Sequence, residues 1–159
     1  MIPYFELITV MLGPVPLQVW GFFAAVGVLL GAWFALRDAR KRGLDADAME
    51  SLVFWTILWA FIGARFFHVI AYEPAFYLSQ PLQSLAVWNG GFSSFGGFIG
   101  AALAFFWKMH RSSLPLFKTA DALTLALPLG LGCGRIGCFL IHDHPGTLAH
   151  GAGKWFAVN

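Results

Sequence analysis

The chain has 159 residues, of which 58% are hydrophobic, 17% aromatic and only 11% charged. An ordinary soluble domain is roughly 45–50% apolar and about 25% charged, so the composition excludes a small water-soluble globule with a polar surface. The net charge is only +2, and the ten Lys and Arg are dispersed along the chain. The sequence therefore has no basic segment of the kind that binds nucleic acid. The surplus apolar surface therefore indicates a protein that faces membrane lipid.

Four apolar segments predict an all-α, polytopic transmembrane helical bundle that forms a single domain over residues 1–159. The first, residues 17–36, is uncharged and has about the ~20 residues needed to cross a hydrocarbon core ~30 Å thick. The other predicted spans are residues 51–72, residues 92–107, which are short and rich in glycine, and residues 119–141. Asp121, near the start of the last span, is interpreted as a first-turn charge favoured by the helix dipole.

Basic residues predict the orientation of these spans, because Lys and Arg are retained in cytoplasmic loops. Residues 37–42 contain four of them and residues 108–118 contain three, whereas residues 1–16 and 73–91 contain none. The two basic loops are therefore expected in the cytoplasm. The N-terminus is expected on the extracytoplasmic side.

Glycines one helical turn apart occur in three of the predicted spans, as the pairs Gly27 and Gly31, Gly96 and Gly100, and Gly130 and Gly134. Such pairs let helix backbones approach closely, which is how helices associate in lipid. Alternatively, the glycines make room for a ligand. The doublets at 90–91 and 96–97 favour that alternative locally, because irregular backbone at membrane depth occurs only beside protein or a wet cavity.

Two arginines lie inside apolar spans, where an Arg costs at least about 2.5–3.5 kcal/mol and needs a partner or a function. Arg65 follows Ser51 by 14 residues and Arg135 follows Thr119 by 16, which places both about 21–24 Å above the cytoplasmic boundary. They could clamp an anionic lipid headgroup, because the planar fork of Arg binds phosphate bidentately. Alternatively, each snorkels to the interface or pairs with a helix-end carbonyl or an acid such as Glu73.

Three polar residues, His142, Asp143 and His144, follow Arg135 by about two helical turns. A carboxylate beside an imidazole can orient a general base, so these residues are candidates for acid–base catalysis. Contiguous ligands on a loop lack a zinc spacing, and the two cysteines, five residues apart, form neither a redox nor a metal motif. No metal site and no cofactor are expected.

The stretch GCGRIGCF at residues 132–139 resembles the G-R-x-G-N-F signature of bacterial phosphatidylglycerol–prolipoprotein diacylglyceryl transferases. Residues 63–65 are similar to the G-G-R segment of that family's second helix. Residues 88–100 are similar to its W-x-G-G-x-S-x-H-G-G-L-I-G block. The resemblance runs from about residue 13 to residue 143, in the family's order and spacing.

The resemblance implies transfer of a diacylglyceryl group from phosphatidylglycerol to the lipobox cysteine of prolipoprotein signal peptides, in the bacterial inner (plasma) membrane. It implies that Arg135 is essential and handles the lipid headgroup, with help from Arg65. The predicted lipid-binding residues are Arg135, Arg65, Gly96, Gly97, Gly134 and Gly137. The predicted catalytic residues are Arg135, His142, Asp143 and His144.

Some positions depart from the family pattern. The family histidine falls on Phe95, which cannot take a proton, so His142 or His144 with Asp143 is expected to replace it. The family has about seven spans, and the chain is therefore expected to be the N-terminal part of a longer fold or a minimal divergent relative. Two alternatives remain open. One is a catalytically inactive protein of the same fold that binds anionic lipid. The other is half of a small dimeric transporter, against which the sequence shows no candidate ion relay beyond Asp121.

Overall fold

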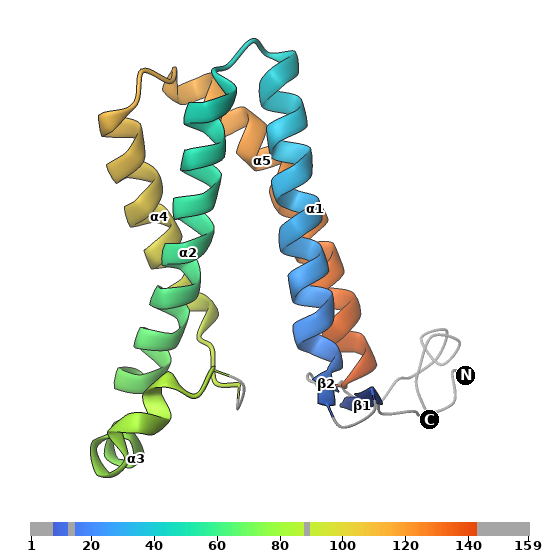
Figure 1. Cartoon of the computed structure of the whole chain (residues 1–159), viewed down its shortest axis with the longest axis vertical. Helices are drawn as coiled ribbons and strands as arrows, with labels where there is room; N and C mark the ends of the chain where they lie inside the picture. The colour runs from blue at the N-terminus through green and yellow to red at the C-terminus, as the bar shows by residue number, and fades with distance from the viewer. Residues whose placement is uncertain (1–7, 13–14, 88–89, 143–159) are drawn as a thin grey trace, which may run out of the picture. The chain divides into compact units, whose positions relative to one another are not determined.

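The computed structural model describes residues 8–12, 15–87 and 90–142, which are mostly helical (Figure 1). Its elements are β1 (Thr9–Leu12), β2 (Val15–Gln18), α1 (Val19–Lys41), α2 (Ala46–Ala71), α3 (Pro74–Ser79), the 3-10 helix η1 (Pro81–Leu85), α4 (Ser94–Arg111) and α5 (Leu116–Leu140). Within these residues, α1, α2 and α5 are long and apolar enough to cross a membrane. The predicted helical membrane fold is confirmed.

The helices differ in their bounds from the predicted spans. α2 begins before Ser51 because Asp45 caps it, its carboxylate accepting a hydrogen bond from the Ala48 N–H at 3.0 Å. α4 has 18 residues and carries three basic side chains in its last turn. At 1.5 Å per residue it is about 27 Å long. Its membrane crossing, and with it the count of four spans, stays a prediction.

A two-stranded antiparallel hairpin precedes α1, where the sequence predicted only an extracytoplasmic segment and the start of the first span. Thr9 pairs with Gln18 and Leu12 with Val15. The Val19 N–H donates to the Ile8 carbonyl at 3.1 Å, which ties the hairpin to the first residue of α1. The first predicted span therefore begins as a strand, and the helix starts two residues later than predicted.

The chain divides into two compact units, residues 1–35 with 123–159, and residues 36–122. In the first unit, glycines bring α1 and α5 together. A Cβ added to Gly27 would lie 2.6 Å from the Gly130 carbonyl oxygen, and one added to Gly31 would lie 3.4 Å from the Ala126 carbonyl oxygen. The predicted close approach is confirmed for these glycines, whereas a Cβ on Gly134 would meet none of the described atoms within 4 Å.

In the second unit, α2 and α4 run side by side in opposite directions (Figure 1). A Cβ on Gly63 would lie 2.5 Å from the Gly96 carbonyl oxygen. Cβ atoms on Gly96 and Gly100 would overlap the carbonyl oxygens of Gly63 and Trp59. The two backbones are therefore in direct contact, and no larger residue fits at these crossings.

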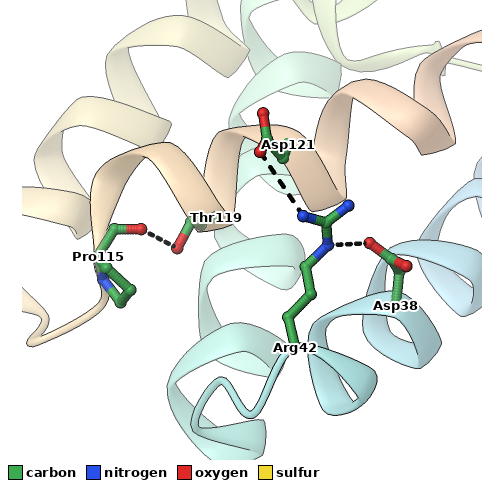
Figure 2. A network of polar contacts seen from close by, with 5 residues as sticks. All are labelled: Asp38, Arg42, Pro115, Thr119 and Asp121. Atoms are coloured by element: carbon green, nitrogen blue, oxygen red, sulfur yellow. Dashed lines mark hydrogen bonds and ion pairs between the residues drawn. The ribbon is translucent and has the colours of Figure 1, made fainter.

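A charged network joins the end of α1 to α5 within the second unit (Figure 2). Arg42 donates from Nε to the Asp38 carboxylate, and its Nη1 lies 3.6 Å from the Asp121 carboxylate. α5 begins at Leu116 and has no acidic residue in its first turn, so the interpretation of Asp121 as a first-turn charge is wrong. Asp121 instead forms an ion pair with Arg42.

Candidate functional site

Arg65 lies six residues before the end of α2 and is buried, with 7% of its surface exposed. A guanidinium group has five N–H donors, and here all five are used. The acceptors are backbone carbonyl oxygens: Nε donates to Ser84 at 2.9 Å, Nη1 to Gly90 at 2.5 Å and Gly91 at 3.0 Å, and Nη2 to Gln83 at 2.8 Å and Ala86 at 3.2 Å. We call these five acceptors the carbonyl cluster.

The carbonyl cluster lies in η1 and in the segment that connects η1 to α4. The predicted alternative paired Arg65 with a helix-end carbonyl or with an acid such as Glu73, whereas the structure pairs it with five carbonyls of η1 and of the residues that follow it. A phosphate would have to displace some of these carbonyls to reach the guanidinium group. Direct contact between Arg65 and a lipid headgroup therefore stays a prediction.

Aromatic rings and a polar pocket surround Arg65. Its guanidinium carbon lies 5.4 Å from the centre of the Tyr77 ring and 5.9 Å from that of Phe92, within the range of cation–π attraction. One turn along α2, the His68 ring stacks on Tyr72 with centroids 5.3 Å apart. A pocket of about 320 Å³ is lined by Arg65, His68, Glu73, Phe76, Tyr77, Gln83, Gly90 and Gly91.

Two glycines shape the wall of this pocket. Gly90 has φ 80° and Gly91 has φ 77°, values that side chains rarely allow. A Cβ on Gly91 would also lie 2.6 Å from His68 Nε2 and 2.8 Å from Arg65 Nη1. The segment can therefore close over Arg65 only with glycine at position 91.

Arg135 holds the corresponding position in α5, because each arginine follows the first residue of its helix by 19 positions. Its environment is different. Arg135 is exposed and, among the described residues, has no hydrogen-bond, ion-pair or aromatic partner. Its guanidinium fork is open to a ligand, whereas a headgroup clamp formed by Arg135 together with Arg65 stays a prediction.

The four glycines predicted to bind lipid have different surroundings. Gly96 is buried in the contact between α2 and α4, and Gly137 is buried where α5 meets α1, with its added Cβ 3.1 Å from Phe23 Cβ. A Cβ on Gly97 would make only ordinary contacts at 3.6 Å, and one on Gly134 would meet open space among the described atoms. Gly134, directly before Arg135, therefore leaves room beside the guanidinium-bearing residue.

The candidate acid–base residues lie at and beyond the end of α5. His142 follows the helix with a positive φ of 51°, and its ring centroid is 6.0 Å from that of Phe139. Asp143 and His144 lie outside the described residues. Phe95, where the resemblance predicts the family histidine, is 60% exposed and packs edge-on against Phe67 at 5.2 Å.

Comparison with known proteins finds a match to the family described as prolipoprotein diacylglyceryl transferase over residues 7–157. A phosphatidylglycerol–prolipoprotein diacylglyceryl transferase of Serratia proteamaculans is 34% identical over 140 residues, covering 87% of this chain and 48% of the relative. The same-named protein of Sodalis glossinidius is 35% identical with the same coverage. That of Nitrosomonas europaea is 33% identical, covering 87% and 51%. The chain spans about half the length of the curated relatives it matches.

Proposed function

Because the chain belongs to the prolipoprotein diacylglyceryl transferase family, we propose that it transfers a diacylglyceryl group from phosphatidylglycerol to the lipobox cysteine of prolipoprotein signal peptides. The names of its relatives support this activity. The proposed location is the bacterial inner (plasma) membrane, with several passes and with the site near the extracytoplasmic surface. The arginine and lysine asymmetry of the loops supports that orientation.

The proposed reaction forms one bond and breaks one. The cysteine thiol loses its proton, because thiolate is the nucleophile, and the sulfur attacks the carbon of the diacylglycerol moiety that is esterified to the phosphate. A C–S thioether bond forms while the C–O bond to phosphate breaks. The bonding electron pair leaves on the phosphate oxygen of glycerol phosphate. The site must therefore stabilise an anion that gains charge and accept one proton from the thiol.

Arg135 is the residue proposed to hold the phosphate. The observation that supports this role is an exposed arginine on an apolar helix, with no partner among the described residues to satisfy its five donors. A fixed fork of donors in a partly desolvated site stabilises charge as it develops on the leaving phosphate.

The proton from the thiol is proposed to pass to a group just beyond α5. His142 follows Arg135 by seven residues, which is about two helical turns, and Asp143 and His144 come directly after it. A neutral imidazole oriented by a carboxylate is suited to accept a proton near neutral pH. These residues are proposed to replace the histidine that the family resemblance places at Phe95.

The proposed function is tested with the full-length protein in vesicles that contain phosphatidylglycerol and a lipobox signal peptide. We expect the peptide to gain the mass of one diacylglyceryl group at its cysteine. A peptide with serine in place of cysteine should gain nothing, and vesicles of phosphatidylcholine alone should give no product. Modification that does not depend on the cysteine, or on phosphatidylglycerol, would contradict the proposal.

A further inference from the structure

We propose that Arg65 is a positioning residue, which fixes the segment from η1 to α4 and does not contact the lipid. This role rests on the proposed transferase function and replaces the direct phosphate contact that the sequence predicts. Its structural basis is the carbonyl cluster, which uses every N–H donor of the guanidinium group. A phosphate bound to Arg65 would displace some of these carbonyls, and a buried carbonyl that loses its donor costs free energy.

The described parts of the segment that contact Arg65 lie on both sides of residues 88–89. The cluster draws on η1, on the buried Ala86 at its end and on the two glycines before α4. Gly91 has no space for a side chain between its backbone and the side chains of Arg65 and His68. Substituting Arg65 or Gly91 is therefore expected to move the backbone at residues 83–86 and 90–91.

The segment in turn determines the position of the first turn of α4. Ser93 is buried, and its N–H donates to the Ala64 carbonyl, next to Arg65, at 3.0 Å. Ser93 also caps α4, its Oγ accepting from the Gly96 N–H at 3.4 Å. Arg65 and the Ser93 cap thus fasten the same connection to α2 at neighbouring residues. What they hold in place is the start of α4, which carries Phe95, Gly96 and Gly97.

Substitution of Arg65 by lysine distinguishes a positioning role from a phosphate-binding role. A lysine keeps the positive charge and can still attract an anionic headgroup as a point charge. It has three donors on one nitrogen and cannot serve five carbonyls spread around a planar fork. If Arg65 positions the segment, Arg65→Lys should be as damaging as Arg65→Gln. If Arg65 binds phosphate, Arg65→Lys should keep much of the activity that Arg65→Gln loses.

The test uses the full-length protein in vesicles, with Cys133 and Cys138 replaced by serine and Ala86→Cys as a reporter in the segment. Labelling of the reporter thiol by a water-soluble maleimide should be slow behind the intact carbonyl cluster. It should rise by about tenfold or more in Arg65→Lys and in Arg65→Gln, in phosphatidylglycerol and phosphatidylcholine vesicles alike. Arg111→Gln, an exposed arginine at the other end of the second unit, is the matched control and should leave labelling unchanged.

Transfer kinetics, measured without the reporter, complete the test. We expect kcat to fall by about tenfold or more in both Arg65 variants, with KM for phosphatidylglycerol within about twofold of the wild-type value. A raised KM at unchanged kcat, or recovery of activity by Arg65→Lys, would overturn the proposal. Unchanged labelling of the reporter thiol would overturn it as well. Absence of transfer by the wild-type protein would contradict the proposed function, while labelling would still decide whether Arg65 holds the segment.

Discussion

At the scale of single residues, two arginines at equivalent positions of their helices have opposite environments. Arg65 is buried, and all its donors are bound to backbone carbonyls. Arg135 is exposed, and no described residue pairs with it. The sequence placed both at one depth but could not distinguish them, because backbone carbonyls have no signature in the sequence. The doublet at 90–91 was the one local signal of an unusual backbone beside Arg65.

Arg135→Lys should lose most transfer activity, and Arg135→Ala should lose more. An ammonium keeps the charge but not the bidentate fork, and removal of one such stabilising group typically costs about 10²–10³-fold in kcat. Initial rates of peptide modification measure the effect. Arg111→Lys, at an exposed arginine in the last turn of α4, is the control and should behave as wild type. Near-normal activity of Arg135→Ala would exclude this residue from the site.

The base is identified by separate alanine substitutions of His142, Asp143 and His144. A true general base contributes about 10²–10⁴-fold, so its loss should dominate, while a neighbouring residue should cost far less. If the triple variant transfers lipid at the normal rate, the substitute-base proposal is wrong.

Phe95→His gives a complementary measurement. It restores an imidazole at the position of the family histidine, on a ring that is 60% exposed. In a variant with His142, Asp143 and His144 changed to alanine, Phe95→His should recover part of the lost rate, because it supplies a proton acceptor again. No recovery would indicate that position 95 does not face the reacting thiol.

At the scale of elements, the apolar runs predicted the helices because lipid-facing surface must be apolar along a whole span. The ends were less predictable. The Asp45 cap extends α2 past the apolar run, and the strand pairs of β1 and β2 are too short to produce a clear alternating pattern. Asp121 was misinterpreted because α5 begins at Leu116, before the predicted span, and its ion pair with Arg42 depends on the fold.

The glycine contacts predict that alanine substitutions will change stability differently at a packed helix surface and at an open one. Gly100→Ala should destabilise the protein by about 1–3 kcal/mol, because its Cβ would overlap the Trp59 carbonyl oxygen in a packed interface. Gly132→Ala is the matched control, since a Cβ there meets no described atom within 4 Å. That change should be neutral or stabilise α5 by up to about 1 kcal/mol through helix propensity. Thermal unfolding in detergent compares the two, and equal loss would contradict the packing described for α2 and α4.

At the scale of the whole molecule, basic side chains gather at one end of the second unit. The Lys108 ammonium donates to Ser51 Oγ at 2.8 Å, which brings the end of α4 to the start of α2, and Arg40 pairs with Glu50 at 2.9 Å. This arrangement fits the predicted cytoplasmic loops. In intact cells, Lys41→Cys should resist an impermeant maleimide until the membrane is permeabilised. Ready labelling in intact cells would place residue 41 outside the cell and contradict the predicted topology.

Phosphatidylglycerol turnover by the full-length protein tests the central claim most directly. The assay follows the diacylglyceryl-modified signal peptide and the released glycerol phosphate in the same reaction, for the wild type and for Arg135→Ala. The proposed function predicts that the two products form in a one-to-one ratio with the wild type and that both nearly disappear with Arg135→Ala. Binding of phosphatidylglycerol by the wild type without either product would contradict the claim and identify a lipid-binding protein without transferase activity.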